Sequence, residues 1–195
     1  MDIMNVGIDI SKALAISGWM SSAELTWLAR QAKKRFVIVE IGSYMGRSTR
    51  ALVDNTPGYV IAIDDWKGPR DIECDRNDLL SKFLTNMRDV AHKIQYIQAD
   101  YDEVYTLPSV SMIKPDMVFI DGDHTYPFAK RDISFWAKEL LIDGLLCGHD
   151  FLSFPDVAKA VRELLPGHRL VMDTDIWCWV KTIDYHNSTG YTSDK

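Results

Sequence analysis

The sequence has few cysteines and no segment typical of a secreted or membrane protein. Its three cysteines, Cys74, Cys147 and Cys178, are odd in number, widely separated and form no Cys-x-x-Cys pair. This argues against a disulfide framework or a zinc site and indicates a reducing compartment. The start lacks the basic and apolar parts of a signal peptide, and no uncharged apolar run approaches a bilayer span. We therefore expect a cytoplasmic protein with no membrane partner.

Positive charge is also scarce. The formal net charge is −6, and the only basic cluster, Lys33-Lys34-Arg35, follows a predicted helix, whose C-terminus it would stabilise. This distribution argues against nucleic acid as a partner. The composition, 47% hydrophobic and 26% charged, is typical of a globular protein, and 195 residues are enough for a single domain with a core.

Apolar runs alternate with helical patterns along most of the chain. Seven runs predict strands, near residues 36–41, 58–63, 94–100, 115–124, 144–150, 168–172 and 176–180. Helices are expected from a capping box at Ser21 and Glu24, and over 79–92, 126–141 and 156–165. The pattern predicts the α/β class with a doubly wound, mostly parallel, Rossmann-like sheet. The last two strands are too close in sequence for a crossover, so an antiparallel last strand is expected.

The stretch 36–49 is the most informative part of the chain. A buried strand runs into Glu40-x-Gly42-x-x-x-Gly46, and a helix begins at Arg47. The glycines permit a tight turn and close approach to a ligand, at which the N–H groups of the helix also point. The middle glycine of the dinucleotide motif is missing, because Tyr44 follows Ser43. Glu40 would repel a pyrophosphate but suits an ammonium group, such as the methionine end of S-adenosylmethionine.

The second strand ends at Asp64-Asp65-Trp66. A carboxylate at this place in nucleotide-binding folds accepts hydrogen bonds from ribose hydroxyls, and Asp64 has the expected spacing of about 20 residues from the glycine turn. Trp66 is a candidate to stack beside an adenine, and packing in the core is an equal alternative. The sequence therefore predicts that this strand end binds the nucleoside part of a cofactor.

Carboxylates and imidazoles occur together after two later strands. Asp121 and His124 follow the fourth strand, and His149 and Asp150 follow the fifth. Such a set suits a divalent cation, with imidazole favouring transition metals, and a bound ion would orient a substrate oxygen and lower its pKa. Alternatively His124 takes the substrate proton itself, or is a structural histidine of its loop.

Together these motifs resemble class I S-adenosylmethionine-dependent methyltransferases of the bacterial O-methyltransferase type, which includes macrocin and catechol enzymes. The resemblance covers residues 18–181. It implies that a methionine moiety is held by Glu40, Gly42, Ser43, Gly46 and Ser48. It places the ribose and adenine near Asp64, Asp65, Trp66 and Asp100. Metal-dependent members bind Mg²⁺ or another divalent cation at the positions that here are Asp121, His149 and Asp150. Those members carry an acid–acid or acid–amide pair where this chain has His149-Asp150, so metal-free catalysis stays open.

The expected reaction is O-methylation of a small molecule by an enzyme whose catalytic residues are His124 and Asp121. Within one domain, we expect a helical segment over 1–34, a substrate lid over 67–92 and a polar tail over 182–195. A plain solvated loop is an equal alternative for the polar part of the lid, residues 67–78. Dimerisation is implied by the resemblance alone. Aromatic and apolar candidates for an acceptor pocket are Trp19, Trp66, Phe83, Met87, Tyr126, Phe151 and Phe154. The alternatives are a nicotinamide-dependent oxidoreductase and a non-catalytic regulatory protein that binds S-adenosylmethionine.

Overall fold

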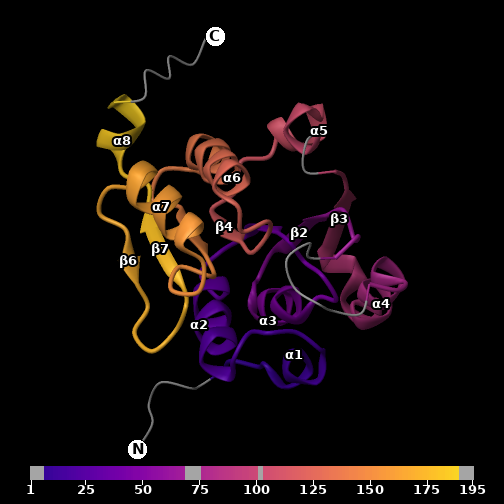
Figure 1. The fold of residues 1–195 in the computed structure, drawn as a ribbon. Coiled ribbons are helices and arrows are strands. Elements are labelled where there is room, and N and C mark those ends of the chain that lie inside the picture. The colour runs from indigo at the N-terminus through magenta and orange to yellow at the C-terminus, as the bar shows by residue number, and fades with distance from the viewer. Residues whose placement is uncertain (1–6, 69–75, 101–102, 189–195) are drawn as a thin grey trace, which may run out of the picture.

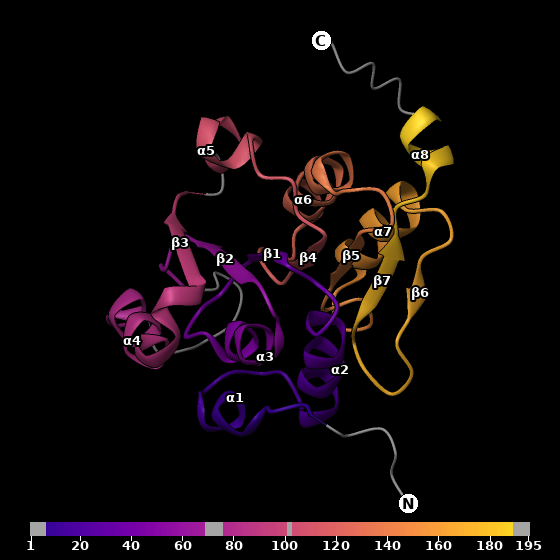
Figure 2. The ribbon, with the colours of Figure 1, turned by 180° about the vertical axis from the view of Figure 1, so that it is seen from behind.

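The computed structural model describes residues 7–68, 76–100 and 103–188. Seven strands form one sheet in the order β3-β2-β1-β4-β5-β7-β6 (Figures 1 and 2). They are β1 (Val37–Ile41), β2 (Tyr59–Asp64), β3 (Ile94–Gln98), β4 (Met117–Ile120), β5 (Leu145–Gly148), β6 (Arg169–Leu170) and β7 (Trp177–Val180). Strands β1 to β5 pair in parallel, whereas β7 is antiparallel to both β5 and β6. The predicted sheet, with its reversed last strand, is therefore confirmed.

Helices cover both faces of the sheet (Figures 1 and 2). One side carries α1 (Ser11–Ala15), α2 (Ser22–Ala32) and α3 (Arg47–Asn55), and the other carries α6 (Tyr126–Glu139) and α7 (Pro155–Leu164). Each side has its own cluster of buried apolar residues. Shorter elements are α4 (Leu79–Asn86), η1 (Arg88–Lys93), η2 (Val104–Thr106), α5 (Pro108–Ser111) and α8 (Ile183–Ser188).

Helix α2 starts as its sequence predicts. Ser21 accepts a hydrogen bond from the N–H of Glu24, and the Glu24 side chain accepts one from the N–H of Ser21, which completes the capping box. The apolar residues at helical spacing, Leu25, Leu28, Ala29 and Ala32, are all buried. The first turn of α2 is thereby fixed against the sheet.

The continuous helix expected over 79–92 is wrong. It divides at Met87 into α4 and the 3-10 helix η1. Arg50 of α3 explains the break, because its Nη1 donates to the carbonyl of Asn86 at 3.0 Å and its guanidinium pairs with Asp89. With the Asn86 carbonyl engaged, the N–H of Val90 bonds instead to the carbonyl of Met87, three residues back.

Two further expectations concern the margins of the domain. The proposed polar tail contains helix α8, which the sequence did not predict, and the Tyr185 ring packs edge-on against Trp179 at 4.7 Å. Residues 189–195 of that tail, and 69–75 of the proposed lid, lie outside the described residues. None of the helices within the described ranges combines the length and apolar character needed to cross a membrane.

Candidate active site

The glycine turn after β1 brings two loops of the sheet edge into contact. Gly42 has a φ of 84°, and a Cβ at this position would lie 2.0 Å from the carbonyl oxygen of Asp121. Only glycine combines this backbone conformation with so close an approach. Gly46 also has a positive φ, of 91°, and a Cβ there would lie 2.6 Å from Cε of Met87. Neighbouring backbone atoms thus require glycine at position 42, whereas at position 46 the positive φ is the main requirement, because the Met87 side chain can move aside.

Glu40 lies beneath this turn, fully buried. Its Oε2 accepts hydrogen bonds from Ser43 Oγ at 2.7 Å and from Thr49 Oγ1, whereas Oε1 is among the buried oxygens without a partner in the described part of the chain. Burial raises the pKa of this carboxyl. The side chain therefore supports Ser43 and the start of α3.

Asp64 binds the same turn from the end of β2. Its Oδ2 accepts from the N–H of Tyr44 at 2.8 Å, and its Oδ1 accepts from the N–H of Trp66 at 2.6 Å. Burial raises the pKa of Asp64 to about 6, although these hydrogen bonds by themselves would lower it. Asp65 is buried and accepts from the N–H of Lys67 at 2.8 Å. Asp64 thus joins the first two strand ends and faces the cavity described next.

A cavity opens at the carboxyl ends of β1, β2 and β4. Its lining comprises Gly18, Trp19, Met20, Gly42, Ser43, Tyr44, Arg47, Ser48, Asp64, Gly68, Asp121, Gly122 and Asp123. Three of these residues are acids. The one arginine, Arg47, donates to the carbonyl of Met20 at 2.9 Å and to that of Ile16 at 2.6 Å. The cavity therefore suits a ligand that carries positive charge.

The predicted cofactor residues divide into two groups. Gly42, Ser43, Ser48 and Asp64 line the cavity, whereas Glu40, Gly46, Asp65, Trp66 and Asp100 lie outside its lining. Trp66 is 6% exposed, packs on Phe83 at 5.1 Å and donates its Nε1–H to the carbonyl of Tyr44. Asp100 pairs with Lys67 at 2.5 Å. The core alternative for Trp66 thus describes its environment better than the stacking alternative.

Of the aromatic and apolar candidates for an acceptor pocket, Trp19 lines the cavity. It is 55% exposed, and its ring lies 5.0 Å from that of Tyr44. The others lie elsewhere: Trp66, Phe83, Met87 and Phe151 are buried, while Tyr126 bonds to Glu163 and Phe154 stacks on His124.

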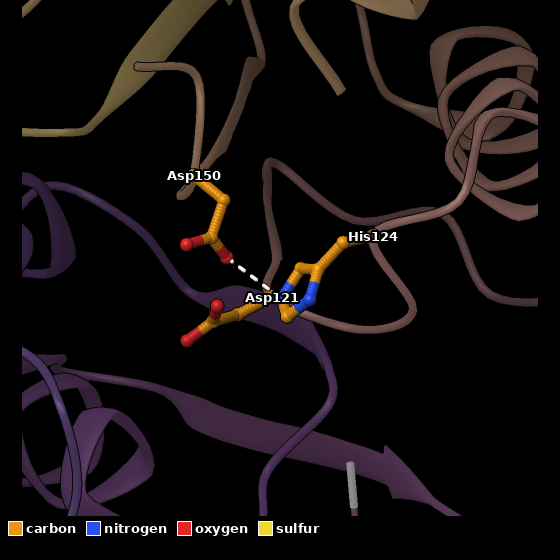
Figure 3. A group of neighbouring side chains, drawn as sticks. All are labelled: Asp121, His124 and Asp150. Atoms are coloured by element: carbon orange, nitrogen blue, oxygen red, sulfur yellow. Dashed lines mark ion pairs between the residues drawn. The ribbon is translucent and has the colours of Figure 1, made fainter. Parts of the chain in front are cut away.

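Asp121, His124 and Asp150 form a compact group beside the cavity, and their ligand atoms lie within 4.8 Å of one another (Figure 3). His124 Nε2 lies 2.9 Å from Oδ2 of Asp150, and the imidazole stacks on Phe154 with 3.9 Å between ring centres. Burial raises the pKa of Asp121 to about 7. The group offers two carboxylates and an oriented imidazole, which is a donor set for proton transfer or for a divalent cation.

His149 has a different environment from His124. Its Nδ1 lies 3.2 Å from Asp150 Oδ1 and 3.8 Å from Asp121 Oδ1, and its Nε2 lies 3.0 Å from Glu24 Oε1. Burial would lower the pKa of His149, but the hydrogen bond with Asp150 and the nearby carboxylates raise it to about 10. The raised pKa keeps the His149 ring protonated, and a metal ligand must be neutral, so His124 is better placed than His149 to complete a metal set.

Comparison with known proteins identifies the family. Residues 39–151 match the model of a methyltransferase domain family. The chain belongs to this family. The matched range begins in β1 and ends beyond Asp150, so it contains the glycine turn, Asp64 and the acid–imidazole group of the methyltransferase.

Three solved structures have the same fold as the methyltransferase. A Bacillus cereus O-methyltransferase in complex with SAH has 15% identity and a TM-score of 0.63, covering 92% of this chain and 94% of the other. TomG from Streptomyces achromogenes, an O-methyltransferase of tomaymycin synthesis bound to SAM, has 18% identity, a TM-score of 0.62 and coverages of 90% and 92%. SAH-bound PaMTH1 from Podospora anserina has 14% identity, a TM-score of 0.64 and coverages of 84% and 80%.

Sequence reasoning missed the part of Glu24 in this site. The capping box predicted a role at the start of α2 only, yet Glu24 also contacts His149 and the N–H of Asp175. These contacts span 125 and 151 residues along the chain, so no local pattern reports them.

Proposed function

We propose that the methyltransferase transfers a methyl group from S-adenosylmethionine to an oxygen atom of a small molecule. The observation that carries this proposal is the acidic cavity at the strand ends, directly beside the group of Asp121, His124 and Asp150. Bound S-adenosylmethionine supplies an electrophilic methyl group on a positively charged sulfur. The acids Asp64, Asp121 and Asp123 give this cavity the charge that a cationic ligand requires.

The lining supports a division of roles. Ser43, Ser48 and the glycine turn would hold the methionine part, and Asp64 would accept hydrogen bonds from the ribose hydroxyls on lone pairs that its backbone partners leave. Trp19 and Tyr44 form the aromatic part of the rim, where a flat acceptor would pack. Binding both ligands side by side would supply much of the rate through orientation.

His124 is our candidate for the general base. The Nε2 atom of its ring faces Asp150, and an imidazole held in this way is a candidate to take the proton of an acceptor hydroxyl. Asp150 stays ionised to hold the ring, because the hydrogen bonds from His124 and His149 outweigh its burial and keep its pKa well below the ordinary value. Asp121, on the cavity side, would orient the acceptor.

A divalent cation fits the same donors. Asp121, His124 and Asp150 would hold it, and it would lower the pKa of an acceptor oxygen. Transfer of a labelled methyl group to a panel of phenols and alcohols, with and without EDTA, separates the two arrangements. Activity that survives EDTA and falls about 10²- to 10⁴-fold in His124→Ala supports the base. Activity that EDTA abolishes and Mg²⁺ or Mn²⁺ restores supports the metal, and full activity of His124→Ala contradicts both roles.

A small-molecule acceptor, rather than nucleic acid or a membrane lipid, agrees with the formal net charge of −6, which would repel a polyanion or an anionic membrane surface. We also propose that the enzyme is cytoplasmic. The two described cysteines, Cys147 and Cys178, carry free thiols, which are typical of a reducing compartment. The lid role of residues 67–92 also remains a proposal, supported by Gly68 in the cavity lining.

A further inference from the structure

Glu24 uses its two carboxylate oxygens for different purposes. Oε2 accepts hydrogen bonds from the N–H and the hydroxyl of Ser21, at 2.7 and 2.8 Å, and so completes the capping box of α2. Oε1 takes no part in the cap. It accepts from the N–H of Asp175 at 3.0 Å and lies 3.0 Å from Nε2 of His149. The side chain thus joins α2, the loop before β7 and the end of β5.

These contacts are shielded from water. Glu24 is 6% exposed, and the side chains of His149 and Asp150 are each 12% exposed. Burial would raise the pKa of Glu24, but hydrogen bonds from the N–H groups of Asp175 and Ser21 lower it to about 2. A charged carboxylate in such a place interacts strongly with its partners, and losing one partner is costly.

The contact with Glu24 determines which way the His149 ring faces. With Nε2 directed at Glu24, Nδ1 is directed at Asp150, whose second oxygen lies 2.9 Å from His124. A continuous series of hydrogen-bonded side chains therefore runs from Glu24 through His149 and Asp150 to His124. In such a series the distal carboxylate fixes the orientation of the imidazole, and the imidazole fixes the next carboxylate.

We propose that Glu24 is a positioning residue of the active site, which holds His149 so that His149 in turn fixes Asp150 and His124 in their reactive arrangement. Glu24 acts through other residues, because it does not belong to the lining of the cavity. The effect on catalysis rests on the proposed methyl transfer, whereas the effect on the His149 ring does not.

Two substitutions separate this role from helix capping. Glu24→Gln keeps the capping box when its single amide oxygen faces Ser21. An NH2 group then replaces the charged oxygen that faces His149 and the N–H of Asp175. Ser21→Ala does the reverse: it removes the cap hydroxyl and leaves Oε1 on His149. The chain thus provides a matched control on the same helical turn.

We would measure kcat and KM of both variants and the ¹⁵N chemical shifts of the His149 ring. The His149 signals are those that disappear from the spectrum of a His149→Gln variant. We expect Glu24→Gln to lower kcat about 10- to 100-fold, with a KM for S-adenosylmethionine close to that of wild type, and to shift the ring signals. Ser21→Ala should lose about 1 kcal/mol of stability, by its effect on the cap, and keep its kcat and ring shifts.

Equal losses of kcat in the two variants, or unchanged ring shifts in Glu24→Gln, would overturn the positioning role. If the wild-type protein transfers no methyl group to any acceptor, the proposed function fails. The ring shifts of the two variants still decide whether Glu24 holds His149. Thermal unfolding of both variants, checked alongside, identifies any loss of activity that comes from a loss of fold.

Discussion

Replacing Gly42 by alanine is expected to destabilise the protein by about 2–5 kcal/mol. The backbone there has a φ of 84°, which costs a residue with a Cβ roughly 1–2 kcal/mol. The new Cβ would lie 2.0 Å from the carbonyl oxygen of Asp121 and 2.9 Å from Cα of Gly122, so one of the two loops must move. Overpacking of this kind adds about 1–3 kcal/mol.

Gly167 provides the control. Its φ is 81°, but no atom of the described residues, apart from its chain neighbours, lies within 4 Å of the position of its Cβ. Gly167→Ala should therefore lose only the conformational part, about 1–2 kcal/mol. Urea unfolding of wild type and both variants measures the difference. Equal losses in the two variants would refute the view that contact between the β1 and β4 loops is what requires glycine at position 42.

Two other predictions concern the site. Asp64→Asn should weaken binding of S-adenosylhomocysteine by about 10- to 150-fold, because hydrogen bonds from the ribose to a charged group are lost. Calorimetric titration measures this affinity, and an unchanged affinity would contradict the assignment of Asp64 to the ribose. The contribution of Glu24 to the free energy of unfolding is complete above its ordinary pKa of 4.5 and disappears as the pH falls toward 2. That of His149 is complete below pH 6.5 and disappears as the pH rises toward 10. The free energy of unfolding lost in Glu24→Gln should thus be largest between about pH 4.5 and 6.5. Urea unfolding of wild type and variant at several pH values measures this loss, and a loss that does not change with pH would contradict the prediction.

The sheet could be predicted because each of its central strands is a short apolar run that ends in turn residues. The carboxyl ends of parallel strands share one edge, so the nearness of Asp64, Asp121 and Asp150 followed from the order of the motifs. The reversed strand β7 followed from the short connection after β6.

What could not be predicted depends on contacts between distant segments. The break at Met87 results from Arg50, and the second use of Glu24 results from His149, far away in sequence in both cases. Glycine can be required at position 42 because a ligand approaches the backbone closely or because another part of the chain does, and the motif alone does not distinguish the two. The structure supplies one of them, the carbonyl of Asp121.

Calorimetric titration of the purified protein with S-adenosylhomocysteine, with NAD⁺ as the control ligand, measures whether the cavity binds S-adenosylmethionine and its product. We expect S-adenosylhomocysteine to bind with a micromolar Kd, about −8 kcal/mol, and NAD⁺ to give no heat of binding. Binding of NAD⁺ without binding of S-adenosylhomocysteine would contradict this expectation.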